Sequence, residues 1–183
     1  HLRSAIDAVD TWLLGLSGDL EFYPGLSQKR AEFLTRAADY YAQFADPESD
    51  DLVLHGEAAR AAIRCGDALQ LSSQPQESLQ RFAAAIAFFR QEVLRNNSNL
   101  RAKKELANAL IGKAIALGRI EDPSNHAQLA GDALSEARDI LRQLALFDVD
   151  AASIQRAMAR VEVATARWAQ QQGQTANALR HFE

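Results

Sequence analysis

Basic side chains recur at helical spacing along three segments of the chain, and they are its clearest candidates for chemistry. Arginine guanidinium groups donate paired hydrogen bonds to carboxylates, and a lysine ammonium group adds a point charge. The same segments carry one aspartate and one asparagine of interest. The candidate residues are Arg60, Arg64, Asp67, Asn108, Lys113, Arg156, Arg160 and Arg167. We expect them to line a groove that binds an acidic peptide segment or a C-terminal carboxylate.

The same residues have an ordinary interpretation as solvated helix faces. Charged side chains three or four residues apart form ion pairs along a helix without binding any partner. The sequence leaves both interpretations open. Charge reversal at Arg160 and Arg167 distinguishes them, because only a binding groove should then lose its partner.

No combination of residues resembles a catalytic motif with a known mechanism. The four histidines do not have the spacing of metal ligands; they are His1, His55, His126 and His181. Cys65 is the only cysteine, and its place on an apolar helix face predicts a buried structural thiol. The sequence contains neither a glycine-rich phosphate loop nor the His-Arg-Asp and Asp-Phe-Gly motifs of protein kinases. We therefore expect a non-catalytic chain with no cofactor and no metal site.

Length, charge and hydropathy limit the class of protein. The chain has 183 residues, of which 48% are hydrophobic and 24% charged, which suits one domain or one repeat array. The formal net charge of -4 argues against bulk nucleic-acid binding, because such binding usually needs a strongly basic surface. No apolar run reaches the roughly 18 residues of a membrane helix, so we expect no direct membrane contact.

The ends of the chain suggest that it belongs to a longer protein. The sequence begins at His1 rather than Met, and it ends at Glu183, early in an expected helix. We expect a segment of a larger polypeptide for this reason. Its compartment stays open: cytoplasmic, or extracytoplasmic if a membrane helix lies upstream.

Helical periodicity covers nearly the whole chain and predicts an all-α fold of about seven helices. Apolar side chains recur every three or four residues, and clusters of glycine, proline and asparagine separate the periodic stretches. No segment alternates apolar and polar residues for long enough to indicate a strand. The expected helices cover residues 3–16, 27–44, 50–72, 75–95, 99–118, 127–147 and 151–172.

Small side chains on the inner faces of these helices predict close packing in antiparallel pairs. Gly66, Gly112 and Ala166 occupy equivalent positions in three of the helices. Stacked helical hairpins have this pattern, because small residues let two helices approach closely. We expect a single domain, 1–183, composed of a leader helix pair at 2–48, a repeat at 50–96, a repeat at 98–147 with a long loop at 119–127, and a truncated repeat at 150–183.

Two segments resemble tetratricopeptide repeats in their order of small and aromatic residues. The first begins at Glu57, has its small residue at Gly66 and continues to Phe82. The second runs from Glu105 to Arg119. The resemblance implies a right-handed α-solenoid, in which the first helix of each pair lines a concave face that binds protein or peptide partners.

The N-terminal third resembles the leader that precedes such repeats in large bacterial serine/threonine protein kinases. The residues that carry this resemblance are Ala8, Val9, Asp10, Leu16, Asp19, Leu20, Pro24, Gly25, Leu26, Arg30, Leu34, Ala37, Tyr40, Tyr41 and Phe44. The resemblance implies that the chain is the interaction or regulatory region of such a kinase, whose catalytic domain lies outside this sequence. If a membrane helix separates the two, the repeats and the kinase domain lie on opposite sides of the membrane.

Two other functions remain open. One is self-association as a homodimer, favoured by Trp12 and Trp168 near the two ends of the array. The other is an all-α sensor with a small-molecule pocket between helices, which tight alanine packing disfavours.

Overall fold

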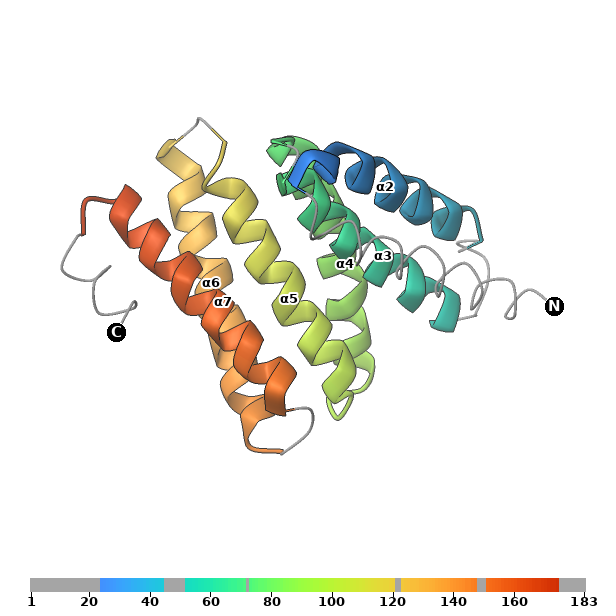
Figure 1. Ribbon diagram of the computed structural model, residues 1–183. Coiled ribbons are helices and arrows are strands. Elements are labelled where there is room, and N and C mark those ends of the chain that lie inside the picture. Colours follow the sequence, from blue (N-terminus) through green and yellow to red (C-terminus); the bar gives the residue numbers. More distant parts are fainter. Residues whose placement is uncertain (1–23, 45–51, 72, 121–122, 148–150, 175–183) are drawn as a thin grey trace.

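The computed structural model describes residues 24–44, 52–71, 73–120, 123–147 and 151–174 (Figure 1). These ranges contain six α-helices and no strand, which confirms the all-α prediction. The expected helix at 3–16 lies outside the described residues. The elements are η1 (Pro24–Leu26), α2 (Ser27–Phe44), α3 (Leu52–Leu71), α4 (Pro75–Arg95), α5 (Leu100–Leu117), α6 (Pro123–Ala145) and α7 (Ala151–Gln171).

Local sequence signals explain where the two central helices begin and end. Helix α4 has Pro75 in its first turn, where the missing N–H costs nothing, and Arg95 in its last turn, where a cation suits the helix dipole. Helix α5 is capped by Asn99, whose side-chain oxygen accepts a hydrogen bond from the Ala102 amide at 3.0 Å. The predicted bounds of both helices, 75–95 and 99–118, agree with the observed ones to within one residue.

Helix α6 begins earlier than the sequence predicted. It starts at Pro123, whereas the prediction placed a long loop at 119–127 and the helix start at residue 127. The error has a physical cause, because proline is favoured at the first position of a helix and does not only mark loops. The earlier start places His126 in the first turn of α6.

Consecutive helices pack against each other along the described chain, and α5 contacts four neighbours. It packs on α4 and α6, which precede and follow it, and it also touches α3 and α7. Figure 1 shows α5 between α3 and α7. Helices α3, α5 and α7 therefore lie side by side.

The core between α3, α4 and α5 is built around one aromatic ring and two glycines. Phe82 of α4 is fully buried. A Cβ atom added at Gly112 would lie 2.2 Å from two ring carbons of Phe82, and one added at Gly66 would lie 2.8 Å from the ring. Both distances are far below van der Waals contact. Only glycine at these two positions lets the ring lie against α3 and α5 at once.

A second cluster joins α2 to α3, and it contains the single cysteine. Cys65 is fully buried, as predicted, beside Ala31 and Leu34 of α2. Burial raises the pKa of the Cys65 thiol, and its hydrogen bond with Thr35, 3.4 Å away, opposes that shift only in part. The thiol is therefore a packing group. Within the described ranges, every helix is too polar or too short to cross a membrane.

Candidate binding face on helices α3, α5 and α7

Polar side chains line one side of the three adjacent helices α3, α5 and α7, which we call the three-helix face. On each helix they recur at spacings of three, four or seven residues, so they share one side of it. The polar members of the face are Glu57, Arg60, Arg64 and Asp67 on α3; Arg101, Lys104, Glu105 and Asn108 on α5; and Arg156, Arg160 and Arg167 on α7, and the apolar Ile115 and Val163 lie among them. Each of these side chains is at least partly exposed.

An ion pair spans the three-helix face from one edge to the other. The Arg160 Nη2 atom of α7 lies 3.2 Å from Asp67 Oδ1 of α3, although 93 positions separate the two residues. Because α5 lies between those helices, the two side chains must meet above it. Sequence reasoning had placed both residues in the groove and had not predicted that they pair.

Glutamine side chains hold the three helices at this spacing. Gln70 of α3 is buried, and its Nε2 donates to the Gly112 carbonyl of α5 at 2.7 Å. Gln171 of α7 donates to the Gly118 carbonyl at 2.9 Å, where α5 ends. Arg119 also donates to the Gln70 carbonyl. Each bond satisfies a carbonyl oxygen of a neighbouring helix, so the face has a fixed framework.

Arg60 is engaged within α3 and is largely buried. Its guanidinium makes two hydrogen bonds to the Glu57 carboxylate, one of them 3.1 Å long, and its side chain is only 12% exposed. It lies beside Gly56 and lines a hollow with Phe88 and Asn99. A partner would have to compete with Glu57 for this arginine.

Three other predicted donors have no such partner. Arg64, Arg156 and Arg167 form no ion pair among the described residues, and each reaches solvent. They come from the two outer helices of the face, α3 and α7. These arginines are therefore the groups most available to an incoming carboxylate.

The remaining two predicted residues differ in position. Asn108 lies on the face and donates to Glu105 on the same helix at 3.4 Å. Lys113 follows Asn108 by five residues, which turns it about 140° around α5. Lys113 is seven residues, or almost two full turns, after Leu106, so the two residues share one side of α5. Leu106 lines a groove between α4 and α6, and Lys113 therefore belongs to the surface opposite the three-helix face. The structure does not bring Lys113 to the groove that the sequence predicted.

The charge of the three-helix face is opposite in sign to that of the chain. Basic side chains outnumber acidic ones among its members, whereas the whole chain has a formal net charge of -4. Charges of one sign gathered on one face raise the local concentration of the opposite sign. The face is thus suited to an acidic ligand and unsuited to a basic one.

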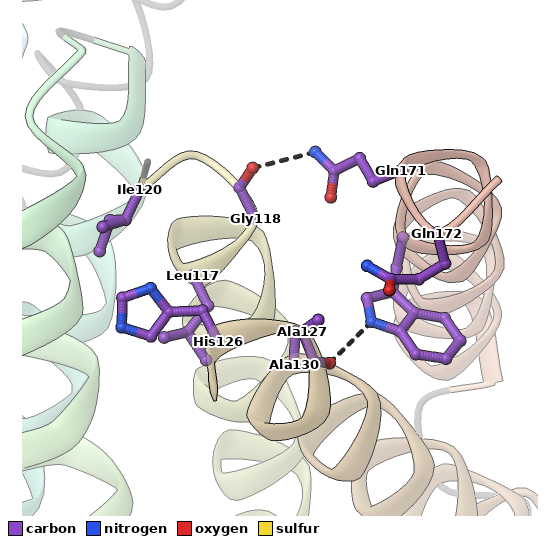
Figure 2. A pocket seen from close by; sticks show the side chains of 9 residues that line it. Leu117, Gly118, Ile120, His126, Ala127, Ala130, Gln171 and Gln172 are labelled. Carbon is purple, nitrogen blue, oxygen red and sulfur yellow. Dashed lines mark hydrogen bonds between the residues drawn. The ribbon is translucent and has the colours of Figure 1, made fainter. Parts of the chain in front are cut away.

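A small pocket lies near one end of this face, where α5 ends, α6 begins and α7 ends (Figure 2). It has a volume of about 220 Å³. Trp168 donates its indole N–H to the Ala127 carbonyl at 2.8 Å, and Gln171 is used in its bond to Gly118. The buried Nδ1 atom of His126 has no hydrogen-bond partner in the described structure.

The chemistry of this pocket is limited by its lining. Its members are Leu117, Gly118, Ile120, His126, Ala127, Ala130, Trp168, Gln171 and Gln172. No carboxylate, thiol or hydroxyl belongs to this set, so His126 has no partner there for acid–base or nucleophilic chemistry. Among the described residues no three His, Cys, Asp or Glu side chains gather as metal ligands would.

Comparison of the chain with protein-family models, with curated proteins and with solved structures finds no match.

Proposed function

We propose that this chain is a non-catalytic protein-interaction scaffold whose three-helix face binds an acidic segment of a partner protein. The observation that carries the proposal is the basic character of that face on a chain with net charge -4. Within the described part of the chain, Arg64, Arg156 and Arg167 have no ion pair to give up on binding. Charge-assisted hydrogen bonds to a carboxylate are among the strongest that such side chains form.

The proposal includes an array of stacked antiparallel hairpins similar to tetratricopeptide repeats. Two features support it: each helix packs on the next, and α5 also touches α3 and α7. In stacked hairpin arrays each unit contacts only its neighbours, and the first helices form a continuous inner surface. The three-helix face would be that surface.

We further propose that the chain is the interaction or regulatory region of a bacterial serine/threonine protein kinase. This part rests on the resemblance of residues 8–44 to the leader in such kinases. The scaffold would then recruit a substrate or regulator to a catalytic domain that lies outside this sequence.

Selection from a displayed random peptide library tests the binding proposal. The immobilised chain should enrich peptides that are rich in aspartate and glutamate. The double variant Arg64→Glu and Arg167→Glu should bind the enriched peptides at least about tenfold more weakly, which corresponds to about 1.4 kcal/mol. Fluorescence anisotropy of a labelled peptide measures the change.

Lys113→Glu is the control for this experiment, because it makes one such charge reversal on the opposite surface of α5. The affinity of this variant for the acidic peptide should stay within about twofold of the affinity of the unsubstituted chain. The proposal fails if enriched peptides carry no acidic bias, or if Lys113→Glu weakens binding as strongly as the double variant does.

A small-molecule sensor is the weaker alternative. The pocket of Figure 2 favours it through the unpartnered Nδ1 atom of His126. However, Trp168 and Gln171 already donate to backbone carbonyls, so few polar groups remain to orient a ligand. Self-association is the other alternative, and it would use a surface other than the three-helix face and this pocket.

A further inference from the structure

The surface opposite the three-helix face carries an apolar groove between α4 and α6. Both helices pack on α5, and Leu106 of α5 lies among the groove's lining residues. Val93 and Leu94 of α4 form one wall, and Ile140 of α6 belongs to the other. The hollow has a volume of about 420 Å³, which exceeds that of the pocket in Figure 2.

Strongly exposed apolar side chains accompany this groove. Leu94 is 85% exposed, and Leu146 and Phe147, just beyond α6, are 83% and 58% exposed. The C-terminal ends of α4 and α6 lie at the same end of the molecule (Figure 1). Exposed apolar groups gathered beside a hollow are typical of a protein-interaction site.

The groove and the protruding leucine make this surface complementary to itself. A two-fold axis makes each copy present the same patch to the other. When that axis runs along the groove, α4 of one copy faces α6 of the second. Leu94 of each copy can then enter the groove of the other copy beside Ile140. The dimer therefore contains this apolar contact twice, related by the two-fold axis.

The charges along the two walls fit the same arrangement. Arg90 of α4 is on one wall of the groove, Glu136 and Asp139 of α6 are on the other, and Lys103 lies on α5 between the two walls. Arg90 and Glu136 already pair across the groove at 2.6 Å. Rotation about an axis along the groove places Arg90 of each copy opposite the acidic wall of the other, which adds electrostatic attraction. A two-fold axis across the groove would instead place α4 opposite α4 and α6 opposite α6, so walls of like charge would face each other.

We propose that the α4–α6 groove is the interface of a homodimer, in which Leu94 of each copy packs into the groove of the other. This surface is separate from the three-helix face, so a dimer would present two such faces. The proposal does not depend on the binding of an acidic partner.

Sedimentation equilibrium of the whole chain over a range of concentrations tests this proposal. The chain should show a monomer–dimer equilibrium. Leu94→Asp should raise the dissociation constant at least about tenfold, because an aspartate cannot enter the groove. Leu71→Asp is the matched control, since Leu71 is also an exposed leucine, at the end of α3, and should leave the equilibrium unchanged.

A charge-exchange pair makes the test independent of Leu94. Arg90→Glu alone and Glu136→Arg alone should each weaken the dimer, and the two together should restore it, because the exchange keeps opposite charges on the two walls. A chain that stays monomeric up to about 1 mM would overturn the proposal, because even a weak contact is populated there. A dimer that ignores both Leu94→Asp and the charge changes would overturn it too, since it must use another surface.

Discussion

The arginines of the three-helix face differ in their availability to an acidic partner, because some of them already pair with a carboxylate of the chain. Glu57 holds Arg60 in a largely buried pair, and Asp67 holds Arg160 in a more exposed one. Arg64 has no ion pair in the described structure. Helical spacing identified all of these residues in the sequence. Their pairing was not predictable, because the Asp67–Arg160 contact joins residues 93 positions apart.

The Asp67–Arg160 pair should act as a competitor for acidic partners. Asp67→Asn removes the carboxylate and frees Arg160, so the affinity for an acidic peptide should rise about threefold or more. Stability should change by less than about 1 kcal/mol, because both side chains are more than a third exposed. Fluorescence anisotropy and urea denaturation measure the two effects.

Glu32→Gln is the control for that experiment. Glu32 pairs with Lys29 on α2, away from both proposed surfaces, and its amide variant should leave peptide affinity unchanged. Lower affinity in Asp67→Asn would show that the carboxylate supports the site rather than competing for it.

Gly112 should be intolerant of a methyl group. In Gly112→Ala the new Cβ would lie 2.2 Å from the buried ring of Phe82, so overpacking should cost about 1–3 kcal/mol in the free energy of unfolding. Gly56→Ala makes the same change in helix α3, where the nearest atom is 3.6 Å away. It should stabilise the chain by up to about 1 kcal/mol through helix propensity. Denaturation curves that show the same sign for both variants would contradict this account of the core.

At the scale of elements, most helix bounds followed from local signals in the sequence. Pro75 and Asn99 mark helix starts through fixed backbone geometry and capping, and α4 runs over the residues that the sequence predicted. The start of α6 was wrong because Pro123 fits both a loop and a first helical turn. Lys113 was misplaced because its polarity was considered without its angle around α5. The bonds from Gln70 and Gln171 were not predictable, since they depend on tertiary distance.

Helix α7 should be the first of α5, α6 and α7 to loosen. It packs on α6 and α5, and Trp168 anchors it through the bond to Ala127 and through its ring against Gly131. Trp168→Ala should raise amide hydrogen exchange in α7 at least about tenfold and leave α3 unchanged, because coupling in stacked helices passes between neighbours.

Trp168→Phe separates the two contributions of the indole. It keeps an aromatic ring near Gly131 and loses the donor to Ala127, so its effect on exchange in α7 should be smaller than that of alanine. If Trp168→Ala accelerated amide hydrogen exchange equally in α3 and α7, the helices would unfold as one cooperative unit.

At the scale of the whole molecule, two opposite surfaces have different character. The three-helix face is basic and polar, and its helices are tied by backbone-directed hydrogen bonds. The α4–α6 groove is apolar, with Leu94 beside it. The sequence predicted the helical class and the polar stripes, since both follow from periodicity. It did not predict the groove, because a hollow between helices depends on how their side chains meet in space.

The most direct test of the central claim follows the arginine side-chain Nε–H signals by NMR while the selected acidic peptide is added. The account predicts that the signals of Arg64, Arg156 and Arg167 shift, because their guanidinium groups donate hydrogen bonds to the carboxylates of the peptide. Arg90 and Arg142, which belong to α4 and α6, should not move. Shifts at Arg90 and Arg142 with none on the three-helix face would contradict the claim.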